Sequence, residues 1–209
     1  MWYLAALALV CSYLLGNLNG AVIVSSIYAH DDVRTHGSGN AGLTNFIRTY
    51  GPQIAVYVIL IDVGKAILAC FASGMLLAGY GHYTDGVALG ALGVIIGHAF
   101  PVFLGFKGGK GILSGVTVAC MLDWRMGLLV FGIFLVAYIL TGYVSLGSVL
   151  SAGSFGFLYW WANSDAGIFP ICVALFLSAM VVWMHRANIV RLLKGQERKT
   201  NLLKKGKSE

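Results

Sequence analysis

Long apolar runs separated by short polar stretches form the dominant pattern of the chain. The first charged residue is Asp31, and no charge occurs between 126 and 164, where the cluster TGYVSLGS (141–148) marks a break between two runs. The other runs cover 2–28, about 54–78, about 86–105, 112–122 and about 167–184. Because a helix of about 20 apolar residues crosses a bilayer, the pattern predicts seven transmembrane helices, the fourth of them, 112–122, being short.

Composition agrees with this interpretation. Of the 209 residues, 58% are apolar and 11% are charged, and the mean hydropathy is +0.82. Soluble domains have about 25% charged residues, so this chain lacks the polar surface that a soluble domain needs. We expect an all-α integral membrane protein with a single transmembrane domain over residues 1–209. A soluble enzyme, a disordered chain and a nucleic-acid-binding domain are excluded.

The distribution of Lys and Arg predicts the orientation. With the N-terminus outside, twelve of these residues fall on the inner side, Arg125 falls outside, and Lys65 lies within a run. Because loops rich in Lys and Arg remain in the cytoplasm, we expect an outer N-terminus and a cytoplasmic C-terminus. This arrangement needs an odd number of spans, which favours counting 112–122 as a crossing.

The first candidate for chemistry is the segment HGSGNAGLTN (36–45) on the inner side. Closely spaced glycines such as Gly39 allow successive N–H groups to converge on an anion. Side-chain donors are available from Ser38, Asn40, Thr44 and Asn45. An ordinary flexible loop is the alternative for this segment taken alone.

The second candidate is the segment FKGGKG (106–111), also on the inner side. It lacks the spacing of a Walker A loop. The amides of Gly108 and Gly109 and the charges of Lys107 and Lys110 could nevertheless bind phosphate. Two lysines that only set the membrane orientation are the alternative, but two such loops on one face favour an anion site.

The third candidate is the segment MHRANIVRLLKGQER (184–198), where the last run leaves the membrane. A basic interfacial anchor explains its arginines and lysines. It does not explain His185 and Asn188, which are i, i+3 neighbours on one helix face. An imidazole beside an amide at this depth could orient a hydroxyl group.

Polar residues inside the apolar runs have a structural explanation. Asp62 and Lys65 are three positions apart, and we expect them to pair because a lone charge in lipid is costly. His98 is expected to make structural hydrogen bonds, with catalysis as the alternative. Only eight acids are present, five of them on the outer face or at the ends of the chain, so we expect no metal site.

Three classes of function fit these features: an enzyme for phosphorylated lipid-associated substrates, a transporter of an anionic solute, and a small assembly subunit. A transporter is expected to place polar groups on interrupted helices near the bilayer midplane. Here they gather in inner loops, which favours the enzyme. An assembly subunit would need neither glycine-rich loop.

Three sequence motifs closely resemble those of one family: GSGNAGLTN (37–45), GHAFPVFLGFKGGKG (97–111) and HRANIVRLLKGQE (185–197). The family is the bacterial membrane glycerol-3-phosphate acyltransferases that use acyl phosphate as donor. The resemblance extends over essentially the whole chain. One departure is Leu43, where the family more usually has alanine, and both residues are apolar.

The resemblance implies transfer of a fatty acyl group from acyl phosphate to the 1-hydroxyl of sn-glycerol 3-phosphate. The products would be 1-acylglycerol 3-phosphate (lysophosphatidate) and inorganic phosphate, in the first acylation of bacterial phospholipid synthesis. No cofactor is implied. The chain would be a single acyltransferase domain of the bacterial cell membrane with a cytoplasmic active site, and the soluble enzyme that supplies acyl phosphate is a candidate partner.

Residue roles follow from the same resemblance. Ser38, Asn40, Thr44, Gly108 and Gly109 would hold the head of the acyl phosphate. The phosphate of glycerol 3-phosphate would bind Arg48, Lys110 and Ser148, with Ser145 as a neighbour of Ser148. His185 and Asn188 would hold its hydroxyls, and together with Lys110 they form the expected catalytic set. The proton could pass to His185 or to the leaving phosphate.

Overall fold

The computed structural model describes residues 1–200, and the regular secondary structure of this part of the chain is all helical, with no strand. Two short 3₁₀ helices, η1 (Val33–Thr35) and η2 (Val102–Leu104), lie in the connections. The α-helices are α1 (Trp2–Gly16), α2 (Gly20–Ala29), α3 (Leu43–Tyr50), α4 (Ala55–Ala78), α5 (Tyr83–Ala99), α6 (Ile112–Leu122), α7 (Trp124–Thr141), α8 (Val144–Ala162), α9 (Ile168–Met184) and α10 (Arg186–Leu193).

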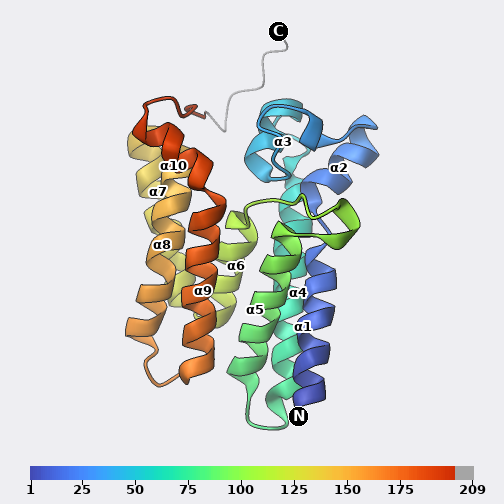
Figure 1. Ribbon diagram of the computed structural model, residues 1–209, viewed down its shortest axis with the longest axis vertical. Helices are drawn as coiled ribbons and strands as arrows, with labels where there is room; N and C mark the ends of the chain where they lie inside the picture. The colour runs from blue at the N-terminus through green and yellow to red at the C-terminus, as the bar shows by residue number, and fades with distance from the viewer. Residues whose placement is uncertain (201–209) are drawn as a thin grey trace.

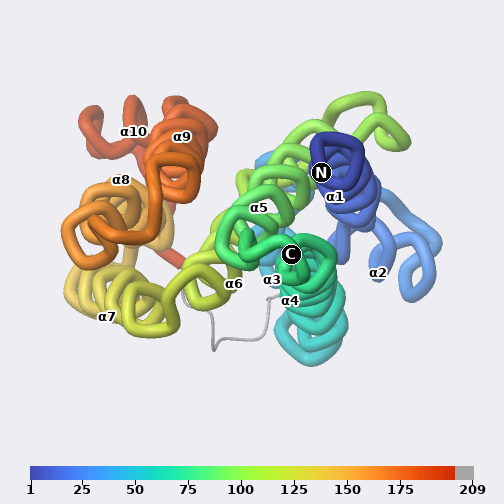
Figure 2. The backbone as a smooth tube through the Cα atoms, turned by 90° about the horizontal axis from the view of Figure 1, so that it is seen from below, coloured from blue at the N-terminus to red at the C-terminus, as the bar shows by residue number. Residues whose placement is uncertain are grey.

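The long helices form two groups (Figures 1 and 2). Helices α1, α4 and α5 pack together on one side, α7, α8 and α9 pack on the other, and α6 lies between them. The short helices α2, α3 and α10 gather at the end of the bundle opposite the N-terminus (Figure 1). The polar connections of this end therefore converge on one face of the molecule.

Several helices have the length and apolarity of membrane spans. Within residues 1–200, four segments are long and apolar enough: Trp2–Ala29 (α1 with α2), Ala55–Ala78 (α4), Tyr83–Leu104 (α5 with η2) and Trp124–Thr141 (α7). Helices α9 and α10 add a fifth if this pair, bent by 56°, is one span. Large apolar side chains such as Leu140 and Trp161 are exposed, as expected for contact with lipid. With a rise of about 1.5 Å per residue, the 11 residues of α6 reach only about half the thickness of a bilayer core. The count of seven spans and the orientation stay predictions.

The first apolar run differs from the single helix expected over 2–28. It is interrupted between α1 and α2, where Asn19 caps the second helix and its Oδ1 accepts a hydrogen bond from the Val22 amide at 3.0 Å. Asn is a preferred N-cap residue because its side chain satisfies a free amide of the first turn. The sequence NLNG (17–20) contains this signal within an otherwise apolar run.

Glycines on α5 allow its close approach to α1 and α4. A Cβ at Gly90 would lie 2.5 Å from the Ala69 carbonyl oxygen, and one at Gly97 would lie 2.1 Å from the Tyr13 carbonyl oxygen. Small residues at such contacts let helix backbones touch inside a membrane. This packing fixes the end of α5, which carries the loop 106–111.

Candidate active site

The three sequence motifs meet at the end of the bundle where α2, α3 and α10 lie (Figure 1). The loop 36–45 leads into α3, and the loop 106–111 joins the end of α5 to α6. The chain bends by 56° between α9 and α10, and His185 stands at this bend. Beyond this bend α10 runs beside α8, away from the other two motifs (Figure 1), and the segment that follows it returns toward α3, where Arg48 donates to Thr200.

A chain of hydrogen bonds joins the second motif to the third. The Lys110 ammonium donates to the Asn188 amide oxygen. The Asn188 Nδ2 donates to Glu197 Oε1 at 2.9 Å, and Arg191 Nε donates to Glu197 Oε2 at 2.7 Å. The structure thus brings Lys110 and Asn188 together as expected. Sequence reasoning missed Glu197, whose only signal was a single acid within a basic segment.

Positive charge dominates this cluster. Arg48 on α3 and Arg191 on α10 are close enough to act electrostatically on Lys110, and within residues 1–200 Glu197 is the one carboxylate acting on it. Burial, with the repulsion of Arg191 and Arg48, lowers the pKa of Lys110 to about 8. Burial acts to raise the pKa of Glu197, but hydrogen bonds from Asn188 and Arg191 hold it below its ordinary value. Three cations against one carboxylate leave an excess charge that suits a phosphate.

His185 has a defined orientation within this cluster. It is 4% exposed, and its Nδ1 lies 2.8 Å from the Val181 carbonyl oxygen. A carbonyl oxygen only accepts hydrogen bonds, so Nδ1 carries the hydrogen. In the neutral ring, Nε2 is then the acceptor and can receive a hydrogen bond from a hydroxyl group.

Asn45 organises the loop 36–45. It is buried, its Oδ1 accepts from the Ser38 amide at 3.0 Å, and its Nδ2 donates to the carbonyl oxygens of Val33 at 3.0 Å and His36 at 3.1 Å. These bonds occupy its side chain, which therefore fits a role in shaping the loop better than the direct substrate contact expected from the sequence. Ser38 and Gly39 are exposed and Asn40 and Thr44 are half-buried, so these four can be reached by a ligand.

The loop 106–111 differs from the expected amide nest. The Gly108 amide donates to the Ala99 carbonyl oxygen at 3.3 Å and the Gly109 amide to the His98 carbonyl oxygen at 3.1 Å, so both amides are used within the protein. A Cβ at Gly108 would lie 2.0 Å from that His98 oxygen. The glycines allow the loop to lie directly on the end of α5, and Lys110 follows from this fixed position.

Arg34 connects the first two motifs and was not singled out from the sequence. Its Nη1 donates to the carbonyl oxygens of Leu104 at 2.9 Å and Lys107 at 3.3 Å, while Asp32 pairs with the same guanidinium at 2.7 Å. Lys107 and Gly39 line an open depression beside it. The structure places these two candidates there, and they take no part in the hydrogen bonds that join Lys110, Asn188 and Glu197.

Two serines, Ser145 and Ser148, lie in the first two turns of α8. Ser148 is buried, and its Oγ donates to the Val144 carbonyl oxygen at 2.8 Å. The Ser145 Oγ is buried without a hydrogen bond within the described residues, and it lies near enough to the Glu197 carboxylate to contribute to its low pKa. Ser145 is thus a polar group of the cluster with unused hydrogen-bonding capacity.

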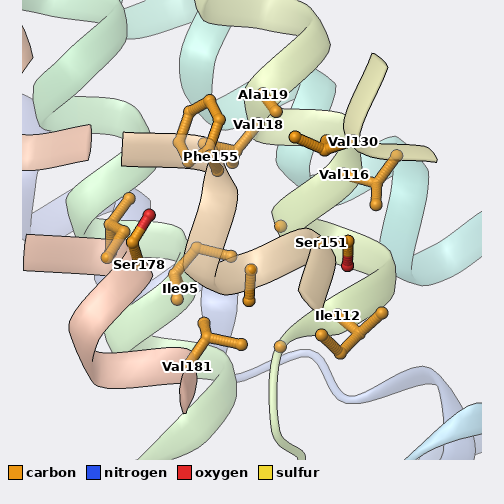
Figure 3. A pocket seen from close by; sticks show the side chains of 14 residues that line it. Ile95, Ile112, Val116, Val118, Ala119, Val130, Ser151, Phe155, Ser178 and Val181 are labelled. Atoms are coloured by element: carbon orange, nitrogen blue, oxygen red, sulfur yellow. The ribbon is translucent and has the colours of Figure 1, made fainter. Parts of the chain in front are cut away.

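An apolar pocket begins at Gly111, directly after Lys110. Side chains of α5, α6, α7, α8 and α9 line it, including Ile95, Ile112, Val130, Phe155 and Val181 (Figure 3). Its lining is almost wholly apolar, with Ser151 and Ser178 as the hydroxyl side chains. The site therefore joins a cationic end to an apolar interior.

Comparisons with known proteins agree with the motifs. The family model described as Glycerol-3-phosphate acyltransferase matches residues 6–195. A glycerol-3-phosphate acyltransferase of Clostridioides difficile (strain 630) is 39% identical over 199 residues, covering 91% of this chain and 92% of the relative. One of Thermoanaerobacter sp. (strain X514) is 37% identical over 197 residues, covering 93% and 95%.

The fold has solved counterparts. Crystal structures of PlsY (YgiH), described as an integral membrane glycerol 3-phosphate acyltransferase, are similar in a glycerol 3-phosphate form and a lysophosphatidic acid form. The TM-scores are 0.85 at 29% identity and 0.82 at 28%, and each match covers 95% of this chain and 96% of the other. The apolar helices and this likeness identify a multi-pass membrane protein. Because the family model covers most of the sequence and the relatives match over nearly their full length, the chain belongs to the glycerol-3-phosphate acyltransferase family.

Proposed function

We propose that the protein transfers a fatty acyl group from acyl phosphate to the 1-hydroxyl of sn-glycerol 3-phosphate. The products are 1-acylglycerol 3-phosphate and inorganic phosphate. One observation carries the proposal: the cationic cluster around Lys110 adjoins the apolar pocket that begins at Gly111. Such a site can bind a phosphate with the start of an acyl chain beside it in the apolar pocket. PlsY, whose fold is similar, is described in forms with glycerol 3-phosphate and with lysophosphatidic acid, which agrees with this pair of substrate and product.

The cluster supports a site for glycerol 3-phosphate. Arg48 and Lys110 supply charge for its phosphate, and the hydroxyls of Ser148 and Ser145 add polar contacts at the start of α8. The Nε2 of His185 accepts a hydrogen bond from the 1-hydroxyl and orients it. Asn188, held between Lys110 and Glu197, keeps the second hydroxyl beside it.

The loop 36–45 supports a site for the donor. Ser38, Asn40 and Thr44 are the groups proposed to hold the acyl-phosphate head, with Gly39 and Lys107 at the edge of the loop. Gly108 and Gly109 contribute by shape, since they let the second loop lie close to α5. The acyl chain then occupies the apolar pocket.

The chemical step requires positioning more than activation. The 1-hydroxyl oxygen attacks the acyl carbonyl carbon, the bond from that carbon to the phosphate oxygen breaks, and inorganic phosphate leaves. The hydroxyl proton passes to His185 Nε2 or to the leaving phosphate. Because acyl phosphate is a mixed anhydride with a good leaving group, alignment and charge neutralisation supply most of the catalysis.

The setting follows from the charge distribution. With twelve Lys and Arg residues on the side of the motifs, we propose that the active site faces the cytoplasm of a bacterial cell membrane. Acyl phosphate would be delivered there by the soluble enzyme that makes it. The acyl chain of the product remains in the bilayer.

A direct assay tests the proposal. Purified protein receives palmitoyl phosphate and glycerol 3-phosphate, and both phosphate release and lysophosphatidate are measured. We expect the two products in equal amounts and none with palmitoyl-CoA, since the motifs include no nucleotide-binding signature. Equal rates with the two donors, or activity only with the CoA ester, would reject acyl phosphate as the specific donor.

A further inference from the structure

A buried ionic network lies beneath the two glycine-rich loops and takes no part in the proposed chemistry. Its members are Asp62 and Lys65 on α4 and His98 on α5, which are 1%, 5% and 4% exposed. The Lys65 Nζ donates to Asp62 Oδ1 at 2.7 Å and lies 2.8 Å from His98 Nδ1. The expected pairing of Asp62 with Lys65 is confirmed, and the structure adds His98 to it.

The same network stabilises the break between α1 and α2. The Lys65 ammonium donates to the Leu18 carbonyl oxygen at 2.7 Å and lies 3.4 Å from that of Gly16. Asp62 Oδ1 accepts from the amide of Gly20, the first residue of α2, at 3.2 Å. A helix end inside a membrane protein leaves backbone groups without partners, and the two charged side chains supply them.

These contacts determine the tautomer of His98. The three short contacts of Lys65, to Leu18, Asp62 and His98, use the three N–H groups of an ammonium. An ammonium has no lone pair, so His98 Nδ1 is the acceptor and the ring hydrogen lies on Nε2. The Nε2 edge faces the loop 106–111, because a Cβ built on Gly109 would lie 2.3 Å from Nε2.

The two glycine-rich loops touch at this edge of the His98 ring. The same Cβ on Gly109 would lie 2.7 Å from the carbonyl oxygen of Ala41, which belongs to the loop 36–45. That oxygen accepts a hydrogen bond from Asn19 Nδ2 at 2.9 Å, and the Gly109 amide donates to the His98 carbonyl oxygen. Ala41, Gly109 and the His98 ring therefore meet at one place, directly before Lys110.

We propose that Asp62, Lys65 and His98 form a positioning network that sets the distance between the two glycine-rich loops, with the His98 ring as the surface on which Gly109 rests. The inference rests on the proposed function, in which these loops hold acyl phosphate. His98 acts through Gly109 and Ala41 and does not touch the reacting atoms. Removal of the ring edge changes the binding of acyl phosphate more than the turnover of bound substrate.

The substitution His98→Asn separates the two ends of the ring. The asparagine Oδ1 can take the place of Nδ1 and accept from Lys65, while the ring edge against Gly109 is lost. With saturating glycerol 3-phosphate, we expect the KM for palmitoyl phosphate to rise at least fivefold and kcat to stay within about twofold. The matched control is His82→Asn at the exposed other end of α5, which should leave both unchanged.

The KM is informative because it does not depend on the fraction of folded enzyme. A second variant, His98→Gln, places an amide near the Nε2 position but gives up the acceptor for Lys65. For His98→Gln we expect a lower unfolding temperature in detergent than for wild type. We expect its KM for palmitoyl phosphate to be closer to the wild-type value than that of His98→Asn. An unchanged KM in His98→Asn, or failure of both variants to yield folded protein, would overturn the proposal.

A measurement without substrate keeps the inference separate from the proposed function. Gly109→Ala should lower the unfolding temperature, because its Cβ would collide with Nε2. In the His98→Asn background, Gly109→Ala should lower the unfolding temperature clearly less, although the contact with Ala41 persists. If the two substitutions lower the unfolding temperature additively, the network is overturned. A wild-type protein inactive with palmitoyl phosphate would overturn the proposed function only.

Discussion

The ammonium of Lys110 donates a hydrogen bond to the amide oxygen of Asn188, 78 residues further along the chain. Glu197 accepts from the nitrogen of the same amide at 2.9 Å, so the amide is held by opposite charges on its two sides. Neither loop nor helix could fix this orientation alone. This hydrogen bond therefore joins the second motif to the third.

Substitution of Lys110 tests whether this site binds a substrate phosphate. If it grips a phosphate, Lys110→Ala should lower kcat/KM for glycerol 3-phosphate at least about a hundredfold, which corresponds to a charged hydrogen bond of about 3 kcal/mol. Lys110→Arg should also be impaired, because a planar guanidinium does not fit the place of a compact ammonium. Steady-state kinetics in detergent are the measurement. The control is Lys194→Ala, at an exposed lysine directly after α10. Wild-type activity in all three variants would contradict phosphate binding by Lys110.

The pH profile should report the charge of the same residue. Because the pKa of Lys110 is lowered to about 8 in the free protein, it is charged below this pH and loses its charge above it. We expect kcat/KM for glycerol 3-phosphate to be highest near pH 7 and to fall above about pH 8, since the substrate phosphate is a dianion above about pH 6.

Glu197→Gln provides the control for this assignment. Glu197 acts to raise the pKa of Lys110, so removal of its charge lowers that pKa further. The alkaline fall of kcat/KM should therefore move to lower pH, while a glutamine oxygen can still accept from Asn188. A fall that stays at the wild-type pH would show that another group causes it.

The apolar pocket predicts a change in chain-length preference. A Cβ at Gly115 on α6 would meet no atom within 4 Å, and Gly115 lines the pocket, so Gly115→Leu should fold and fill part of it. We expect kcat/KM with palmitoyl phosphate to fall at least tenfold and that with an eight-carbon acyl phosphate to change little. Gly132→Leu on α7 also has open space around its Cβ and lies outside the pocket. If neither variant changes the ratio of kcat/KM for palmitoyl phosphate to that for the eight-carbon acyl phosphate, the acyl chain binds elsewhere.

Topology can be tested with single cysteines. In a version without the four native cysteines, Asp85→Cys lies in the first turn of α5 and Lys194→Cys directly follows α10. The start of α5 is at the same end of the bundle as the N-terminus, and α10 is at the other end (Figure 1). We expect an impermeant maleimide to label position 85 in intact cells and position 194 only after lysis. The reverse pattern would invert the orientation inferred from the basic residues.

Much of the helical layout could be predicted because apolar runs of defined length have few alternatives in a membrane. The predicted run 54–78 corresponds to α4 (Ala55–Ala78), 112–122 to α6 (Ile112–Leu122) and 167–184 to α9 (Ile168–Met184). The break at 141–148 is also confirmed, because Gly142, with φ of 75°, ends α7. The division of 2–28 was missed, since hydropathy does not register an N-cap within an apolar run.

The site was less accessible to sequence reasoning. Residue types and loop composition predicted an anion site in these loops, but the partners of each amide depend on tertiary contacts. The amides of Gly108 and Gly109 meet carbonyl oxygens of α5, and Asn45 is used inside its own loop. Arg34 joins segments about 70 residues apart, and Glu197 accepts from Asn188 and Arg191 across the turn that follows α10. Both roles depend on how the chain folds back, which no sequence pattern shows.

The role of His185 is the last question that the geometry makes testable. Its Nδ1 is committed to the Val181 carbonyl oxygen, so Nε2 can act as a base or only as an acceptor that orients the hydroxyl. His185→Ala should lose at least about a hundredfold in kcat/KM in either case. His185→Gln separates the two roles, because an amide oxygen near the Nε2 position accepts a hydrogen bond but takes no proton at neutral pH. We expect His185→Gln to retain at least a tenth of the wild-type kcat, because in the proposed reaction the leaving phosphate can accept the proton of the attacking hydroxyl. A glutamine variant as inactive as the alanine variant, in folded protein, would instead assign the base to His185.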